Sequence, residues 1–253
     1  MLSLPLMSGY VNLWGKHSVF EAIKQKKRKI ARIQCIDSLR DEVAEVLFDA
    51  HIDTRNVSLE IVDRNFLNKR FPDVQHQGIL LTCSSLSCCK LSLCTHIEPN
   101  DRIIALDQIN DPHNVGAIIR SMAALGFKHL LMTKDHSPPL DGTVAKNACG
   151  ALEHIHVIKV TNLADGLIQL KKKGFWVFGL EEHGSKCSDN LKTDGCVLVI
   201  GSEGKGIRQR VRSECDAFVK IETETNFSVL NASVAAALGM HIMRTKHETN
   251  KNK

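Results

Sequence analysis

The sequence predicts an α/β protein with a small N-terminal domain and a larger C-terminal domain built on a mostly parallel sheet. Its 253 residues suffice for one large domain or two modest ones. Apolar segments of strand length alternate with segments of helical period, which favours layers of helices and strands. Pro99, Asn100 and Asp101 interrupt the chain directly before a new apolar strand, and we place the domain boundary there.

The first domain is expected over residues 1–83 as a small α/β unit. Val19, Phe20 and Ile23 are spaced like the buried stripe of a short helix. The expected elements are a helix at 15–24, a strand at 30–36, a helix at 38–50, and strands at 57–62 and 78–82. Residues 84–100 lack a steady period and are expected to form a linker, which Leu86, Leu91 and Leu93 could cover with a short strand or helix.

The second domain is expected over residues 101–245, followed by a polar tail at 246–253. Strands are expected at 103–106, 130–132, 154–160, 175–180 and 197–200, and helices at 115–125, 163–173 and 232–243. These strands are apolar throughout and separated by helices. That pattern is typical of a parallel sheet covered on both faces.

Composition and charge restrict the class of protein. The chain is 43% hydrophobic and 24% charged, as in ordinary soluble globular proteins. It contains no run approaching the roughly 18 apolar residues that cross a bilayer, and its opening residues do not match a signal peptide. We therefore expect a cytoplasmic protein without a membrane partner. The net charge of +5 permits nucleic-acid binding without establishing it.

The nine cysteines raise the question of a metal site. Cys83, Cys88, Cys89 and Cys94 are close in sequence, and His96 follows them. The run contains no Cys-x-x-Cys pair, however, and offers no further histidine at ligand spacing. We expect reduced thiols and no metal.

The first segment with chemical potential is residues 107–127, in which a strand ends in a polar loop that opens a helix. Asn114 is predicted to cap this helix, and Gly116 would allow close approach to its first turn. Arg120 follows Asn114 by six residues. A solvated helix arginine is the simpler interpretation of Arg120 taken alone.

The second segment is residues 197–212, in which a buried strand runs directly into Gly201, Glu203 and two further glycines. Glycines after a strand indicate close backbone approach or sharp turns. The spacing matches neither a Walker phosphate loop nor a dinucleotide fingerprint. Glu203 suits a cationic or amine-bearing partner, including an arginine. A plain glycine turn is the alternative.

The third segment, residues 221–243, opens the last helix at Asn231. Asn231 is expected near the cap of that helix. Ala235, Ala236, Ala237 and Gly239 would give the helix a thin face for close packing. A normally capped helix accounts for this segment if it is taken alone.

Together these three segments resemble the SpoU/TrmH family of RNA ribose 2′-O-methyltransferases, within the knotted SPOUT class. The family shows an Asn-x5-Arg segment, a glycine-rich strand end with a Glu, and a Leu-Asn-x-Ser helix opening, and all three occur here in that order. The resemblance covers about residues 101–245. In the first domain, Trp14-Gly15-Lys16-His17 with Glu21-Ala22, and His76-Gln77-Gly78, resemble the substrate-binding domain that precedes many members.

The resemblance implies a SPOUT domain with a deep trefoil knot, preceded by an L30e-like substrate-binding domain. It implies S-adenosylmethionine as the methyl donor, held in the knot, and a homodimer with its site between subunits. The implied catalytic residues are Arg120, which would act on the target hydroxyl, with Asn114, Glu203 and Asn231. The implied donor-binding residues are Leu180, Gly201, Ile221, Leu230 and Ser233.

The expected partner is RNA, because RNA carries the 2′-hydroxyl. Over the whole chain the resemblance is greatest to members that methylate a guanosine of 23S rRNA. A tRNA 2′-O-methyltransferase is an alternative, although the additional N-terminal domain favours rRNA. A non-catalytic RNA-binding protein is a second alternative. Lys205, Arg208, Arg210 and Arg212 around the glycine loop could bind phosphates, or could be solvated.

The sequence departs from the family at the last motif. Where the family commonly has Ser-Leu-Asn, Val229 takes the place of the serine, and Ser228 lies one residue earlier. Either the serine hydroxyl is dispensable in this chain, or Ser233 or Ser228 substitutes for it.

Overall fold

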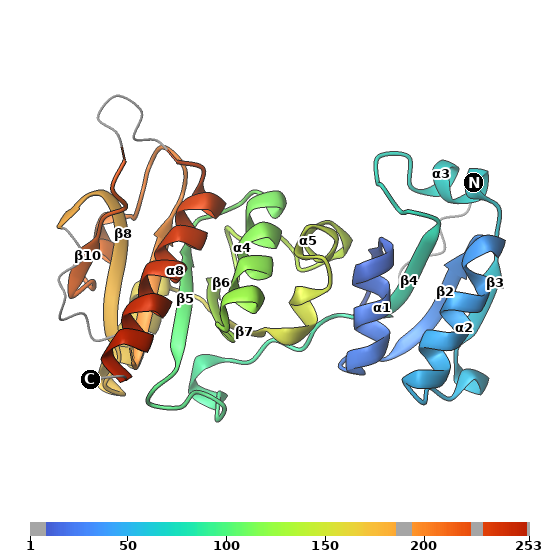
Figure 1. Cartoon of the computed structure of the whole chain (residues 1–253), viewed down its shortest axis with the longest axis horizontal. Helices are drawn as coiled ribbons and strands as arrows, with labels where there is room; N and C mark the ends of the chain where they lie inside the picture. Colours follow the sequence, from blue (N-terminus) through green and yellow to red (C-terminus); the bar gives the residue numbers. More distant parts are fainter. Residues whose placement is uncertain (1–8, 186–193, 224–229, 252–253) are drawn as a thin grey trace. The chain divides into compact units, whose positions relative to one another are not determined.

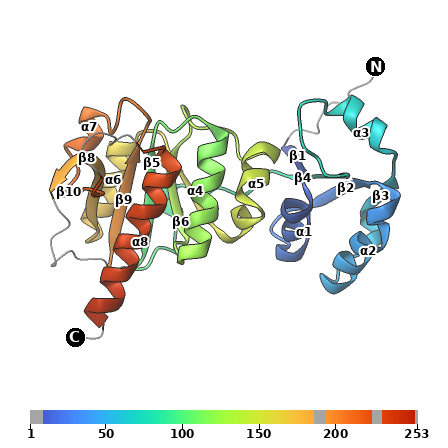
Figure 2. The same ribbon diagram turned by 45° about the horizontal axis from the view of Figure 1, so that its top comes forward.

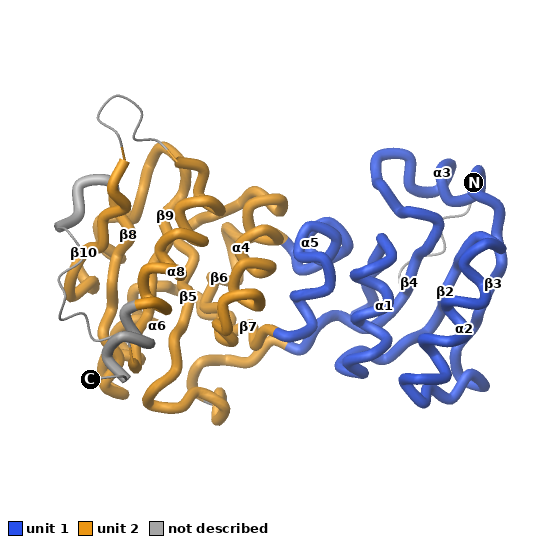
Figure 3. Tube along the Cα trace, viewed as in Figure 1, with its two compact units in different colours: residues 1–87, 139–154 blue, residues 88–138, 155–253 orange. Residues whose placement is uncertain are grey.

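The computed structural model describes residues 9–185, 194–223 and 230–251. Its chain divides into two compact units (Figure 3). Unit 1 comprises residues 1–87 and 139–154, and unit 2 comprises 88–138 and 155–253. Each unit is thus built from two separate stretches of sequence, whereas the domains expected from the sequence are continuous.

Unit 1 contains a four-stranded sheet in the order β1-β4-β2-β3. Strands β2 and β3 are parallel, and β4 pairs antiparallel with both β1 and β2. The elements are β1 (Tyr10–Trp14), α1 (Lys16–Gln25), β2 (Ile30–Cys35), α2 (Arg40–Asp49), β3 (Ser58–Ile61), α3 (Arg64–Arg70), β4 (Ile79–Ser84) and α5 (Gly142–Ala148). The predicted helices and strands are present, while β1, α3 and α5 are additional.

Residues 139–154 belong to unit 1 through specific contacts. The Ser18 hydroxyl, on α1, donates a hydrogen bond of 2.8 Å to the Ala145 carbonyl of α5. The Trp14 ring lies against Gly142, where a Cβ atom would come within 2.2 Å of it. A side chain at position 142 would therefore displace the tryptophan. After α5, a 3₁₀ turn (Ala151–His154) places Glu153 in the interior of unit 1.

Unit 2 is built on a six-stranded sheet in the order β10-β8-β9-β5-β6-β7, and all neighbouring strands are parallel. Its strands are β5 (Arg102–Asp107), β6 (His129–Thr133), β7 (His156–Val160), β8 (Trp176–Ser185), β9 (Cys196–Gly201) and β10 (Ala217–Val219). Its helices are α4 (Pro112–Leu125), α6 (Leu163–Lys172), α7 (Gln209–Arg212) and α8 (Ala232–Lys251). The predicted parallel sheet is confirmed.

Helices cover both faces of this sheet. Figures 1 and 2 show α4 and α8 side by side on one face. On the other face, Leu163 and Leu167 of α6 join the same buried cluster as Ile103 and Ala105 of β5. Alternate residues of each strand face opposite helix layers. The strands therefore need apolar residues at every position, and this requirement is why the sequence pattern identified them.

Each helix that borders the site differs from the prediction at one end. Helix α4 begins at Pro112 and is capped by Asp111, whose Oδ1 accepts the His113 N–H at 2.9 Å. The prediction that Asn114 caps α4 is wrong, since Asn114 is buried inside the first turn. Helix α8 continues to Lys251, through residues expected to be a polar tail. Along the described residues, no helix combines the length and apolar character of a bilayer span.

Part of the segment expected as a linker is paired with the edge of the unit 2 sheet. The Cys89 N–H donates to the Val157 carbonyl at 3.1 Å, and the Cys89 carbonyl accepts the Lys159 N–H at 3.0 Å. Leu91 and Cys94 are buried beneath these contacts. The segment therefore shields the exposed edge of β7.

The trefoil knot stays a prediction, because the path it requires includes residues 224–229, which lie outside the described residues. Ser228 and Val229 also lie outside the described residues, so the question of the motif serine stays open.

Candidate active site

The glycine segment after β9 folds back on itself. The Ser202 N–H donates to the Gly206 carbonyl at 3.2 Å, and the Gly206 N–H donates to the Ser202 carbonyl at 2.9 Å. A Cβ atom on Gly201 would lie 2.3 Å from the Gly206 carbonyl carbon, so only glycine fits there. Gly204 and Gly206 have positive φ angles, of 77° and 63°. The tight turn presents Glu203 at its tip.

Glu203 lies at the centre of a hydrogen-bond network that joins the three predicted segments. Its Oε1 accepts the Asn114 side-chain amide at 3.0 Å, the Asn231 amide at 2.7 Å and the Ala232 backbone N–H at 3.2 Å. The Asn231 amide also donates to the Asn114 Oδ1 at 3.0 Å. Residues far apart in the sequence thus meet where β9, α4 and α8 come together.

This network fixes the direction of each amide. The Asn231 Oδ1 accepts two hydrogen bonds from Ser233, one from its backbone N–H at 2.9 Å and one from its hydroxyl at 2.6 Å. The Asn231 nitrogen must therefore face Glu203 and Asn114. Asn231 also caps α8, as predicted, and the Glu203 carboxylate stabilises the same positive helix end. The three donors to the Glu203 Oε1 thus hold the tip of the glycine segment against α4 and the start of α8.

Arg120 lies on the exposed side of α4, whereas Asn114 faces the interior. Six residues along a helix correspond to about 9 Å of rise and leave the two side chains about 120° apart around the axis. Among the four predicted catalytic residues, the hydrogen bonds described above join Asn114, Glu203 and Asn231. Arg120 points from α4 in a different direction.

A cavity of about 530 Å³ lies beside this network, at the level where Leu180 of β8 pairs with Ile200 of β9. Four of the five predicted donor-binding residues line it, namely Leu180, Gly201, Ile221 and Leu230. Ser233 contacts Asn231 instead. The sequence reasoning missed several lining residues, which include Glu181, Ile207, Arg212, Thr223 and Ala235. Glu181 could have been identified from its position directly after Leu180, the last residue of a predicted strand.

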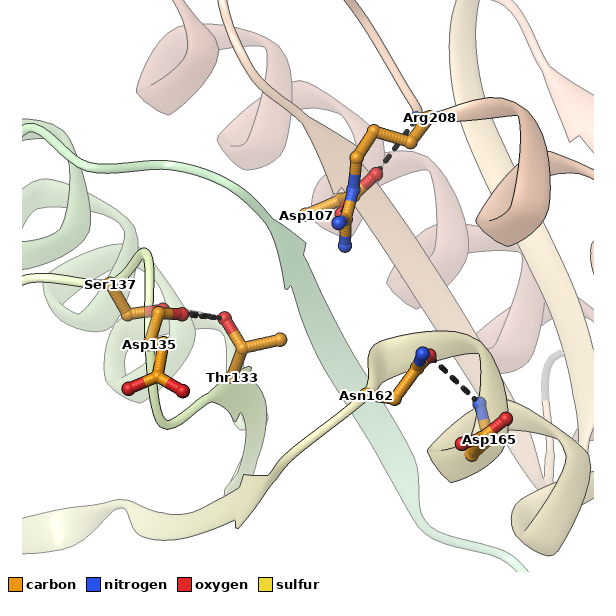
Figure 4. Close-up of polar contacts among 7 residues, drawn as sticks. All are labelled: Asp107, Thr133, Asp135, Ser137, Asn162, Asp165 and Arg208. Atoms are coloured by element: carbon orange, nitrogen blue, oxygen red, sulfur yellow. Dashed lines mark hydrogen bonds and ion pairs between the residues drawn. The ribbon is translucent and has the colours of Figure 1, made fainter.

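Three of the four basic residues around the glycine segment are paired with carboxylates. Arg208 binds Asp107, Arg210 binds Asp165 and Arg212 binds Glu181. These three arginines are therefore less available to bind phosphates than the sequence alone indicated. The Asp107 carboxylate is fully buried and accepts both the Arg208 backbone N–H and its Nε, each at 2.8 Å. Figure 4 shows this pair together with the contacts of Thr133 with Ser137 and of Asn162 with Asp165.

We expect Asp107→Asn to loosen the glycine segment, because an amide cannot accept both Arg208 contacts as a buried carboxylate does. Hydrogen exchange of the amides in residues 201–208, followed by mass spectrometry, should accelerate about tenfold to thirtyfold. Asp165→Asn is the matched control, because the Arg210–Asp165 pair is exposed and such pairs contribute little. Equal exchange in both variants would contradict the anchoring role of Asp107.

The cysteines within the described residues are free thiols. Burial raises the pKa of Cys83, Cys196 and Cys215 to about 12, and that of Cys94 to about 11. Within the described part of the chain, no three His, Cys, Asp or Glu side chains are grouped so that they could hold a metal ion.

Two family models match the chain. Residues 101–241 match the SpoU rRNA Methylase family, and residues 13–87 match the model described as RNA 2′-O ribose methyltransferase substrate binding. The fold and the matched segments thus define the class of RNA methylases in which a substrate-binding domain precedes the catalytic domain. The chain belongs to the SpoU rRNA Methylase family.

Named relatives support this assignment, and a solved structure shows the same fold. A Staphylococcus aureus relative named for the TrmH family of tRNA/rRNA methyltransferases is 43% identical over 148 residues, which cover 58% of this chain and 60% of that protein. The Pseudomonas aeruginosa 23S rRNA (guanosine-2′-O-)-methyltransferase RlmB is 32% identical over 92% of this chain and 95% of its own length. The structure of the SpoU methyltransferase AviRb from Streptomyces viridochromogenes, in complex with AdoMet, superposes with a TM-score of 0.78 at 18% identity. That superposition covers 96% of this chain and 92% of AviRb, and it shows a shared fold.

Proposed function

We propose that this protein transfers a methyl group from S-adenosylmethionine to a ribose 2′-hydroxyl of RNA, and that the substrate is a guanosine of 23S rRNA in the cytoplasm. The observation that carries the proposal is the Asn114–Glu203–Asn231 network beside the cavity. It unites the three sequence segments that the family shares.

The cavity suits a nucleoside donor. Its volume of about 530 Å³ lies within the range of small-molecule sites. Ile200, Ile221 and Leu230 offer apolar contacts for a base. The backbone of the glycine segment, and the Glu181 and Glu203 carboxylates, offer polar contacts for a ribose and for cationic groups. The residues present therefore fit S-adenosylmethionine, which would supply an electrophilic methyl group on a sulfonium.

In the proposed reaction, the protein must orient the ribose hydroxyl and stabilise the alkoxide that forms as its proton leaves. Arg120 is assigned to the alkoxide. A guanidinium is a poor base because it keeps its proton in proteins, but it is an effective fixed charge. A phosphate of the RNA or a water would take the proton. Asn114, Glu203 and Asn231 hold the glycine segment and the start of α8 in one geometry.

The proposal includes a homodimer. Val234 and Leu238, one turn apart on α8, are 47% and 40% exposed, which is unusual for large apolar residues on one helix face. Arg120, also exposed, projects away from Asn114 of its own chain. An α4–α8 surface that packs against a second copy would cover the apolar residues and bring Arg120 to the partner's cavity.

Val234→Glu combined with Leu238→Glu is expected to convert the dimer into monomers, because two buried like charges would face their copies across the interface. Light scattering after size exclusion would give a mass of about 28 kDa in place of twice that value. Methyl transfer should be lost together with the dimer. Phe48→Glu, which places the same charge at an exposed apolar residue of unit 1, serves as a control. A double variant that stays dimeric would exclude this surface.

A tRNA substrate is the second candidate, favoured by the S. aureus relative, whose name includes both RNA classes. A non-catalytic RNA-binding protein is the third, because the motif serine is replaced by Val229. Each alternative predicts a different result in one assay.

The test is methyl transfer from labelled S-adenosylmethionine to 23S rRNA and to bulk tRNA, both taken from cells that lack the enzyme, with the labelled nucleoside identified. Label in 2′-O-methylguanosine of 23S rRNA supports the proposal. Label in tRNA alone overturns the rRNA assignment. Absence of both transfer and donor binding leaves an RNA-binding protein as the better account.

A further inference from the structure

The same cavity is also lined by an ion pair, neither partner of which is among the predicted catalytic or donor-binding residues. Glu181 lies on β8 directly after Leu180, and Arg212 ends α7. The Arg212 Nε donates to the Glu181 Oε1 at 2.9 Å and to the Oε2 at 3.3 Å, while its Nη2 donates to the Oε2 at 3.2 Å. Two nitrogens of the guanidinium thus donate hydrogen bonds to the carboxylate.

The pair is held in place from a second side. The Arg212 guanidinium lies over the Phe218 ring, 4.5 Å from its centroid. Phe218 in turn occupies the space above Gly179, where a Cβ atom would come within 2.7 Å of the ring. A guanidinium stacked on a ring and forked on a carboxylate has little rotational freedom. Glu181 is therefore presented to the cavity in one orientation, and only 18% of its side chain is exposed.

We propose that the Glu181 carboxylate, oriented by Arg212, accepts hydrogen bonds from the ribose hydroxyls of the donor nucleoside. The inference rests on the proposed donor site. A forked guanidinium occupies one edge of a carboxylate and leaves acceptor positions on the outer side of each oxygen. A vicinal diol carries two donors at a matching separation, and in dinucleotide folds an acidic side chain accepts a hydrogen bond from a ribose hydroxyl.

The charge of the pair also selects the ligand. A carboxylate at this position accepts hydrogen bonds from the ribose hydroxyls and would repel a phosphate on the same ribose. Arg212 compensates the charge of Glu181 through their ion pair. Glu181 is thus assigned to binding, whereas Arg212 is a positioning residue that acts through it.

The test is isothermal titration of the full-length protein with S-adenosylhomocysteine and with its 2′-deoxy and 3′-deoxy analogues. The measured quantity is the ratio of the analogue Kd to the parent Kd. For the unaltered protein this ratio should be about tenfold or more, as expected for hydrogen bonds to a charged acceptor. For Glu181→Gln the parent should bind about tenfold more weakly, and the ratio should fall to about twofold.

Two further variants separate binding from folding. Asp165→Asn removes the carboxylate of the exposed Arg210–Asp165 pair, which does not line the cavity, and should leave both the affinity and the ratio unchanged. Arg212→Lys keeps the charge but loses the fork. It should lower the ratio by a smaller factor than Glu181→Gln, with an unchanged thermal melting curve.

Each outcome decides a separate point. A Glu181→Gln protein that binds S-adenosylhomocysteine with the original ratio overturns the role of Glu181 and leaves the proposed function intact. An unaltered protein that binds none of the three ligands overturns the donor site itself, and with it this inference. A ratio that falls to about twofold in Glu181→Gln, falls less in Arg212→Lys and is unchanged in Asp165→Asn supports it.

Discussion

Replacing Arg120 by alanine is expected to lower kcat for methyl transfer by a factor of about 10² to 10³, the effect of removing one preorganised group that stabilises a developing oxyanion. The affinity for S-adenosylhomocysteine should change less than twofold. Arg120 lies on the exposed side of α4 and is not among the residues that line the cavity. Single-turnover kinetics and calorimetry on one preparation would measure both quantities.

Arg120→Lys is the matched variant, because lysine keeps the charge and loses the planar fork of donors. An intermediate rate would support charge stabilisation with directed hydrogen bonds. A near-complete rate at neutral pH would show that a positive charge at this position suffices and that the planar fork of donors is not required.

In the proposed homodimer, mixed subunits would show which chain supplies Arg120. If Arg120 serves the partner's cavity, a dimer of one Arg120→Ala chain and one Asn231→Ala chain contains a single complete site, although each homodimer is inactive. If Arg120 serves its own chain, every site in the mixed dimer carries a lesion. About half the normal rate in the purified mixed dimer therefore supports the interface, and an inactive mixed dimer contradicts it.

The sheet of unit 2 could be predicted because parallel strands covered on both faces need apolar residues at every position. The network could be predicted only in part. Asn114, Glu203 and Asn231 were identified by sequence motif, but the assignment of Asn114 as a helix cap was wrong because Asp111 and Pro112 begin the helix earlier. A local pattern cannot distinguish a cap from a buried amide whose partner lies 89 residues away.

Pairings between distant residues explain the other omissions. Arg208, Arg210 and Arg212 read as a basic patch, since nothing local indicates that Asp107, Asp165 and Glu181 lie against them. Likewise, residues 139–154 precede a strand of the unit 2 sheet in sequence and pack in unit 1. No sequence motif indicated that position 142 must be glycine, although a side chain there would occupy the space of the Trp14 ring.

The strongest expected effect on stability concerns Arg28 and Glu153, which are buried together in unit 1. The Arg28 Nε donates to the Glu153 Oε1 at 2.8 Å, its Nη1 donates to the Ser84 carbonyl, and the two side chains are 0% and 1% exposed. Glu153→Leu would leave a buried cation without its partner. We expect the free energy of unfolding of unit 1 to fall by about 3–5 kcal/mol.

The two tryptophans make this measurable, because Trp14 belongs to unit 1 and Trp176 to unit 2. In a Trp176→Phe background, urea unfolding followed by fluorescence reports on unit 1 alone, through a ring that packs on Gly142. The double variant Arg28→Met, Glu153→Leu is the informative control. Removing both charges avoids the unpaired cation, so it should be more stable than Glu153→Leu alone. If the single variant instead unfolds within about 1 kcal/mol of the parent, the residues of 139–154 do not depend on this ion pair for their place in unit 1.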